Sequence, residues 1–196
     1  NDAPVLALVS DVSFDEDQGG STNLSGSDVD GDQLTFSITE GTDIVASLNV
    51  NDVSFSAPLN FNGSESFTVS VTDGEYTDSQ AITVTVSAVN DAPIASEGLS
   101  ALTTEDQSVV ISLSGSDIDG DNLTFSLGDD ATSGSVSIDG SLATYMPNTD
   151  FNGSDSFTFS VSDGEYSASA SVDVDVTAVN DAPVLALVSD VSFDED

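Results

Sequence analysis

The amino-acid sequence predicts an all-β protein made of two tandem sandwich domains in an elongated array. Three observations support this prediction. The chain repeats itself, short segments alternate between apolar and polar residues, and no segment has a convincing helical period. The apolar fraction of 38%, with ten Phe and three Tyr, is sufficient for a core and argues against a disordered acidic tail.

The repeat is marked by the sequence Asn-Asp-Ala-Pro, which begins at Asn1, Asn90 and Asn180. It predicts a first repeat at 1–89, a second at 90–179, and the start of a third at 180–196. Residues 1–17 and 180–196 are identical, as expected for a duplicated two-repeat unit or an engineered chain. The chain begins within the pattern, so we expect a piece of a longer array. Proline favours extended geometry in the residue before it, which suits a short, stiff joint.

Strands are expected where apolar and polar residues alternate. The clearest are 67–71 and 82–86 in the first repeat, and 157–161 and 172–176 in the second. Tight turns are predicted at Asn62-Gly63, Asp73-Gly74, Asn152-Gly153 and Asp163-Gly164. About seven short strands in each repeat are typical of an immunoglobulin-like sandwich. The predicted core residues are Leu34, Phe36, Phe67, Val69, Val84, Val86, Leu123, Phe125, Phe157, Phe159, Val172 and Val174.

The charge is one-sided, because the chain has 36 acidic residues and no Lys, Arg or His. Clustered carboxylates repel each other by about 1 kcal/mol per close pair even in water. No side chain can neutralise them, which suggests metal ions, and oxygen ligands favour Ca²⁺. Nucleic acid and anionic membrane surfaces are excluded as partners because both need Lys or Arg. No apolar run is long enough to span a bilayer, and the lack of Cys excludes disulfides.

Acidic motifs recur once in each repeat. Asp28-Val29-Asp30-Gly31-Asp32 returns as the loop 117–121, and an Asp-Gly-Glu triplet occurs at 73–75 and at 163–165. Glu-Asp pairs stand at 16–17 and 105–106. An EF-hand is excluded, since it needs Gly and Glu where Gln33 and Thr39 stand. Solvated acidic turns and ordinary Asp-Gly hairpins are the alternative interpretation of these motifs.

Taken together, the motifs resemble the cadherin pattern, and most closely the cadherin-like tandem repeats of very large secreted bacterial adhesins. The resemblance covers both full repeats and the start of the third. It implies calcium ions at the joints between consecutive domains. The linker Val-Asn-Asp-Ala-Pro departs from the cadherin pattern by lacking its second Asn, and adhesion through an exchanged Trp is excluded because there is no Trp.

Carried over residue by residue, the resemblance implies one complete junction and two half-sites. The complete junction would use Glu16, Asp73, Glu75, Asn90, Asp91, Asp117 and Asp119, with Asp17 and Asp121 as further ligands. The N-terminal half-site would comprise Asn1, Asp2, Asp28, Asp30 and Asp32. The C-terminal half-site would comprise Glu105, Asp106, Asp163, Glu165, Asn180 and Asp181. The segment from Val184 to Asp196 is expected to be loose or paired with the sheet edge of another molecule.

The expected function is a calcium-rigidified stalk repeat of an extracellular or cell-surface bacterial adhesin, with a role in adhesion and biofilms. We expect a monomer whose partners are its neighbouring repeats and Ca²⁺, without nucleic acid and without membrane insertion. One alternative is a module that binds a carbohydrate or partner surface directly. Another is halophilic adaptation, in which acidity serves solubility in high salt.

Catalysis is not expected. The chain lacks His, Cys and Lys, which removes most pairs of nucleophile and base. Two carboxylates can hydrolyse glycosides, but every acidic cluster here recurs in each repeat, whereas an active site is usually unique.

Overall fold

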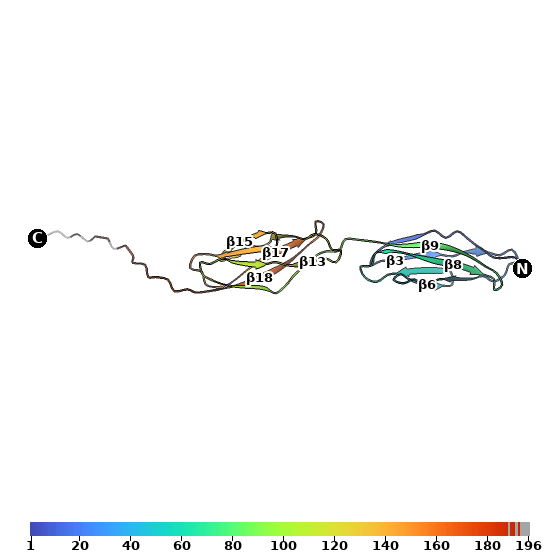
Figure 1. Ribbon diagram of the computed structural model, residues 1–196, viewed down its shortest axis with the longest axis horizontal. Helices are drawn as coiled ribbons and strands as arrows, with labels where there is room; N and C mark the ends of the chain where they lie inside the picture. The colour runs from blue at the N-terminus through green and yellow to red at the C-terminus, as the bar shows by residue number, and fades with distance from the viewer. Residues whose placement is uncertain (188, 191, 193–196) are drawn as a thin grey trace. The chain divides into compact units, whose positions relative to one another are not determined.

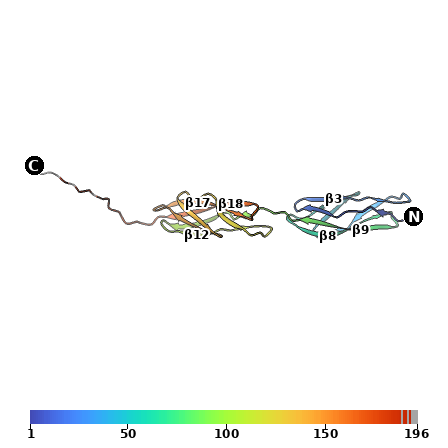
Figure 2. The ribbon, with the colours of Figure 1, turned by 90° about the horizontal axis from the view of Figure 1, so that it is seen from above.

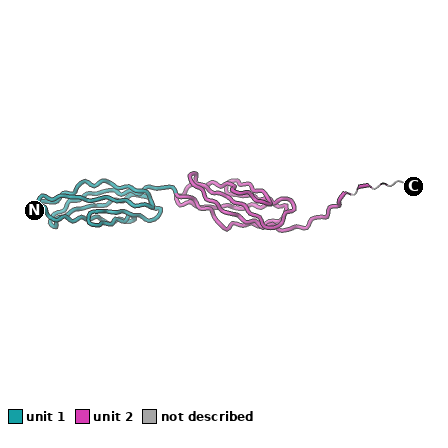
Figure 3. Tube along the Cα trace, turned by 180° about the vertical axis from the view of Figure 1, so that it is seen from behind, with its two compact units in different colours: residues 1–90 teal, residues 91–196 magenta. Residues whose placement is uncertain are grey.

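The computed structural model describes residues 1–187, 189–190 and 192, and these residues form strands, turns and loops without any helix. The all-β prediction is therefore confirmed for the described part of the chain. Two compact units are present, Asn1–Asn90 and Asp91–Asp196 (Figure 3). No helix in the described residues could cross a membrane.

Each unit contains nine strands in its described residues. Figure 1 draws the strands as arrows and labels several of them in each unit. Those of unit 1 are β1 (Val5–Leu6), β2 (Val12–Asp15), β3 (Gly19–Asn23), β4 (Gly26–Ser27), β5 (Thr35–Ile38), β6 (Val45–Asn49), β7 (Asp52–Ser56), β8 (Gly63–Thr72) and β9 (Thr77–Ser87). Those of unit 2 are β10 (Ile94–Ala95), β11 (Leu99–Thr104), β12 (Val109–Ser112), β13 (Gly115–Ser116), β14 (Thr124–Leu127), β15 (Gly134–Asp139), β16 (Leu142–Pro147), β17 (Gly153–Ser162) and β18 (Ser167–Thr177).

The strands of each unit form a sandwich of two sheets with seven strands between them. In unit 1 the sheets have the orders β2-β9-β8-β5 and β3-β7-β6, and in unit 2 the orders β11-β18-β17-β14 and β12-β16-β15. The two remaining strands of each unit form a short pair, β1 with β4 and β10 with β13. The long hairpin of β17 and β18 is seen from above in Figure 2. This is the predicted immunoglobulin-like arrangement.

The core lies between the two sheets and follows the predicted alternation. Phe67 and Val69 of β8, with Val84 and Val86 of β9, are all buried. In unit 2, the predicted core residues Phe157, Phe159, Val172 and Val174 are buried as well. The predicted core residues Leu34, Phe36, Leu123 and Phe125 are partly buried and pack against these clusters.

The segment that leads into β2 in unit 1 differs from the segment that leads into β11 in unit 2. In unit 1, Asp78 accepts a hydrogen bond from the Leu6 N–H (2.8 Å) and Gln80 accepts one from the Val9 N–H (3.1 Å). The equivalent positions in unit 2 hold Ala168 and Ala170. There β11 pairs with β18 over six residues, whereas β2 pairs with β9 over four. The two extra pairs of unit 2 involve Leu99 and Ser100. In unit 1 the Asp11 side chain instead accepts the N–H of Thr83 at 2.7 Å.

Equivalent carboxylates hold a loop in each unit. Glu65 accepts hydrogen bonds from the N–H groups of Asp43 (2.7 Å) and Thr42 (2.9 Å), and those bonds lower its pKa. Asp155 accepts from the Ser133 N–H (2.9 Å) and from the hydroxyl of buried Tyr145 (3.0 Å).

The Asp155 carboxyl and the Tyr145 phenol, which are hydrogen-bonded to each other, both have shifted pKa values. Burial opposes ionisation of Asp155, but the hydrogen bonds from Ser133, Ser156, Tyr145 and Thr132 together lower its pKa below the ordinary value. Burial and the neighbouring carboxylate raise the pKa of the Tyr145 phenol. The ionised form of Asp155 is therefore the one that the fold of unit 2 stabilises.

We predict that Asp155→Asn destabilises unit 2 by about 1–3 kcal/mol at neutral pH, because the new amide group would face hydrogen-bond donors. A lowered folded pKa stabilises the fold above the unfolded pKa and ceases to do so as the pH falls through the folded value. Denaturant unfolding across pH should thus show a gap between wild type and variant that narrows below about pH 4.

The matched control is Asp173→Asn, an exposed carboxylate on the outer side of β18. It should leave the unfolding free energy nearly unchanged. A gap for Asp155→Asn that is constant across pH would show that the carboxylate charge contributes nothing.

Candidate cation-binding poles

The acidic motifs gather at the two ends of each sandwich. We call the end that carries the Asp-x-Asp-Gly-Asp loop the entry pole, and the end that carries the Glu-Asp pair the exit pole. In unit 1 they are separated by the length of β9, whose 11 residues span about 33 Å. One end of β9 is the turn after Thr72, while the other lies beside Asp15, which pairs with Ser87 just before Glu16.

The acidic loop of the entry pole is shaped by the first of its three Asp residues. Asp28 Oδ1 accepts hydrogen bonds from the N–H groups of Asp30 (2.9 Å) and Asp32 (3.2 Å), and Gly31 has a φ of 80°. The three Asp residues each offer an oxygen within 4.8 Å of the others. Asp28 Oδ2 is buried and has no hydrogen-bond partner among the described residues. The loop therefore presents an unsatisfied oxygen within a carboxylate cluster.

The same loop recurs in unit 2. Asp117 Oδ1 accepts hydrogen bonds from the N–H groups of Asp119 (3.0 Å) and Asp121 (3.3 Å). Asp117 Oδ2 is buried, and no described residue donates a hydrogen bond to it. Asp91, which follows the Asn90 of the linker, donates its N–H to Asp119 at 2.8 Å. The linker is thus hydrogen-bonded to the acidic loop of unit 2. In unit 1 the N–H of Asp2 donates to Asp30 in the same way.

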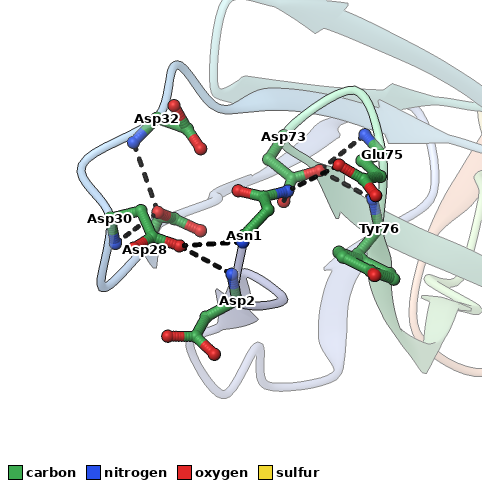
Figure 4. A network of polar contacts seen from close by, with 8 residues as sticks. All are labelled: Asn1, Asp2, Asp28, Asp30, Asp32, Asp73, Glu75 and Tyr76. Carbon is green, nitrogen blue, oxygen red and sulfur yellow. Dashed lines mark hydrogen bonds and ion pairs between the residues drawn. The ribbon is translucent and has the colours of Figure 1, made fainter.

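The Asp-Gly-Glu triplet forms the turn between β8 and β9 and belongs to the entry pole (Figure 4). Asp73 Oδ1 accepts from the N–H groups of Tyr76 and Glu75, both at 2.7 Å, and these bonds lower the pKa of Asp73. The side-chain amide of Asn1 donates to Asp73 Oδ2 (3.1 Å) and to Glu75 (3.3 Å). Backbone and amide N–H groups take the place of the missing Lys and Arg.

This position corrects the sequence-based grouping. We grouped Asp73 and Glu75 with Glu16, and Asp163 and Glu165 with Glu105. The structure places each triplet at the opposite pole from its Glu-Asp pair. In unit 2, Ser162 pairs with Thr124 next to the acidic loop, whereas Glu105 hydrogen-bonds the end of β18 through Thr177. One strand separates the triplet from the linker, so the two cannot lie at the same end.

The exit pole of unit 1 contains a buried carboxylate. Glu16 is only 4% exposed. Its Oε1 accepts the N–H of Val89 at 2.6 Å, and its Oε2 has no hydrogen-bond partner within the described part of the chain. The neighbouring Asp17 accepts the N–H of Asn60 at 2.9 Å. A buried carboxylate oxygen without a partner is costly unless a cation or proton satisfies it.

The exit pole of unit 2 has the equivalent buried Glu and neighbouring Asp and adds one acid. Glu105 is 5% exposed and accepts the N–H of Val179. Asp106, Asp150 and Asp181 offer oxygens within 4.8 Å of one another. Burial raises the pKa of Asp181, and the charges of Asp150, Glu105 and Asp106 raise it further.

Asp150 was missed in the sequence because it belongs to no repeated acidic motif. Its counterpart in the first repeat is Asn60, so a comparison of the repeats hides it. The only sequence signal is a polar residue before a Phe-Asn-Gly turn. Asn180 lies beside the cluster in sequence and donates to the Asp181 carbonyl at 3.2 Å.

The donor chemistry of the poles fits a hard divalent cation. The ligand atoms that cluster are carboxylate oxygens, which suit Ca²⁺ or Mg²⁺ better than softer metals. The buried oxygens of Glu16, Asp28 and Asp117 that lack a hydrogen-bond partner among the described residues are consistent with such a cation. Calcium ligation by the predicted site residues stays a prediction.

A shallow hollow of about 520 Å³ lies over the strands β3, β6 and β7, apart from the poles. Its lining consists of Ser21, Thr22, Asn23, Ser47, Leu48, Asn49, Asp52, Val53 and Ser54. Small-molecule sites are usually lined by apolar and aromatic side chains, and no aromatic residue lines this one. The hollow therefore gives no support to the alternative of a direct carbohydrate-binding module.

Comparisons with known families agree with the two-repeat organisation. Residues 1–88 match the bacterial cadherin-like domain, and residues 90–177 match the bacterial Ig domain. No curated protein matched the sequence.

Solved structures share the fold. Human protocadherin-24 EC1-2 aligns with a TM-score of 0.59 and 15% identity, covering 92% of this chain and 100% of that one. Its second crystal form gives a TM-score of 0.62 and 16% identity at the same coverage. At these identities the likeness shows the fold alone.

An endo-fucoidan hydrolase from glycoside hydrolase family 107, MfFcnA4, aligns at 24% identity over 90% of this chain, with a TM-score of 0.38 that carries no argument. The chain spans only 29% of the length of that hydrolase. The family matches, the internal repeat and the cadherin fold lead to one conclusion: this chain is a tandem of cadherin-like and immunoglobulin-like repeats of the kind found in bacterial proteins.

Proposed function

We propose that the chain is a calcium-binding stalk segment of an extracellular bacterial adhesin, in which calcium ions at the poles rigidify the joints between consecutive repeats. The observation that carries this proposal is Glu16. It is buried at the exit pole, its Oε2 has no hydrogen-bond partner, and its Oε1 accepts the N–H of Val89, next to the linker residue Asn90.

The chain connection supports a role at the joint. The N–H of Val89 donates a hydrogen bond to Glu16 at the exit pole of unit 1. The N–H of Asp91 donates one to Asp119 in the acidic loop of unit 2. Only Asn90 stands between them in sequence. Ions that fill both poles would therefore act on a linker of very few residues.

The residues that would hold calcium divide by pole. At entry poles they are the three Asp residues of the acidic loop and the acids of the Asp-Gly-Glu triplet. At exit poles they are the Glu-Asp pair and the linker Asp. Bound calcium would supply positive charge that offsets carboxylate repulsion. Extracellular calcium modules bind at about 10⁻⁴ to 10⁻³ M, a range in which the joint would be flexible in a cytosol and stiff outside a cell.

We predict that the effect of Glu16→Gln on the free energy of unfolding is neutral or stabilising without calcium and destabilising with it. In chelator the variant should be as stable as wild type or more so, because a buried charge without a partner has been removed while the bond to Val89 can persist. In calcium at a hundred times its dissociation constant, the wild type should gain about 2.7 kcal/mol per saturated site. Denaturant unfolding of unit 1, followed in chelator and in calcium, measures the free energy of unfolding under each condition.

The control for this variant is Glu40→Gln, which alters an exposed carboxylate of unit 1. It should behave like wild type in both conditions. If Glu16→Gln gains as much stability from calcium as wild type does, Glu16 is not a ligand.

We also predict that calcium stiffens the chain in solution. Small-angle scattering after exhaustive chelation should show a rise in maximum dimension and a rod-like profile on addition of calcium, with magnesium as a control. The double variant Asp117→Ala, Asp119→Ala should lose this response, because it removes two of the three acids of the unit 2 loop. A profile that ignores several millimolar calcium would favour solvated turns and a direct binding module instead.

A further inference from the structure

We propose that the two exit poles are calcium sites of unequal strength, and that the stronger and weaker kinds alternate along an array of these repeats. This inference rests on the proposed calcium function and adds to it the order in which the joints fill. The deciding difference is one residue, Asn60 in repeat 1 and Asp150 in repeat 2.

The backbone of the two poles is the same. Asp17 and Asp106 have φ values of 61° and 60°, and Asn60 and Asp150 have values of 56° and 57°. The Asn60 N–H donates to Asp17 Oδ1 at 2.9 Å, as the Asp150 N–H donates to Asp106 Oδ1 at 3.3 Å. Asn and Asp both tolerate this left-handed conformation. The molecule thus contains a natural matched pair in which an amide replaces a carboxylate.

The charge of the two poles is not the same. In unit 2, Asp150 places its carboxylate within 4.8 Å of those of Asp106 and Asp181. Glu105, only 5% exposed, precedes Asp106 in sequence, and its charge helps to raise the pKa of Asp181. In unit 1, the equivalent of Asp150 is a neutral amide.

Acidity is not the only sign of a ligand at these poles. Glu16, at the exit pole of unit 1, is buried to the same degree as Glu105 and has an oxygen without any hydrogen-bond partner. An unsatisfied buried carboxylate indicates a cation independently of the exposed acids around it. At the exit pole of unit 1 burial thus points to a cation as acidity does, and we expect Asp150 to set the affinity of the equivalent pole of unit 2.

Calcium affinity rises with the number of charged ligands. The extra carboxylate attracts the ion, and the ion relieves the repulsion among the acids. The Asp150 pole should bind about tenfold more tightly than the Asn60 pole, which corresponds to about 1.4 kcal/mol. As calcium rises, joints after repeat 2 would fill before joints after repeat 1.

The alternation follows from the internal repeat. Residues 180–196 reproduce residues 1–17, including the Glu-Asp pair, so the next repeat begins as a copy of repeat 1. If the two-repeat unit as a whole is what is duplicated, each unit of an array carries one Asn60-type pole and one Asp150-type pole.

The test is an NMR calcium titration of the whole chain, following the backbone amides of residues 60 and 150, which report one exit pole each. In wild type, the amide of Asp150 should shift with an apparent dissociation constant about tenfold lower than that of Asn60. Asp150→Asn should weaken its pole about tenfold, and Asn60→Asp should strengthen the other by a similar factor. The double exchange should reverse the order, and Asp173→Asn should change neither.

The outcomes separate this inference from the proposed function. If the wild-type chain binds no calcium, the proposed function fails and this inference fails with it. If it binds calcium but the exchanges alter each constant by less than about twofold, the proposed function stands and the inequality of the poles is overturned. Circular dichroism and the dispersion of amide signals check that each variant is folded.

Discussion

The absence of any cationic side chain governs how the carboxylates of this chain are held. N–H groups of the backbone and of side-chain amides supply the positive partial charge instead. Asp28 and Asp117 each collect two backbone N–H groups on one oxygen, as Asp73 does. Asp155 and Glu65 hold loops in the same way. A neutral donor can fix the position of a carboxylate, but it leaves the net charge in place.

The consequence differs between the body and the poles of each unit. Within the sandwich, Glu65 and Asp155 stand apart and are satisfied by hydrogen bonds, so their pKa values are lowered. At the poles the acids are crowded. There one oxygen of Asp28 and one of Glu16 remain without a partner. Hydrogen bonds from neutral donors thus satisfy the isolated carboxylates inside the unit but leave the crowded carboxylates at its ends without full compensation.

Much of the fold could be predicted because alternation decides which side chains face the core. The strands around Phe67 and Val84 and their copies in the second repeat were found in this way. The grouping of the acids was harder. Asp73-Gly74 was recognised as a turn, and one strand follows it before the linker; that length alone places the turn at the far pole. The resemblance to cadherins implies the other grouping, in which the turn shares a site with Glu16.

Other features leave no trace in local sequence. Tyr145 meets Asp155 because β15 and β16 bring a loop beside β17, which depends on the tertiary packing of the sandwich. Asp150 joins Asp106 and Asp181 from three separate segments, although its own surroundings look like an ordinary turn. Long-range contacts of this kind require the register of the sheets, which alternation alone does not fix.

The most direct test of the central claim is a crystal structure of the chain grown in calcium, with anomalous differences recorded at a long wavelength. If carboxylates without cationic partners are completed by calcium, anomalous peaks should lie within 2.3–2.6 Å of the carboxylate oxygens at the poles, including Glu16 Oε2 and Asp28 Oδ2. Well-ordered poles that bind only water at these oxygens would contradict the account.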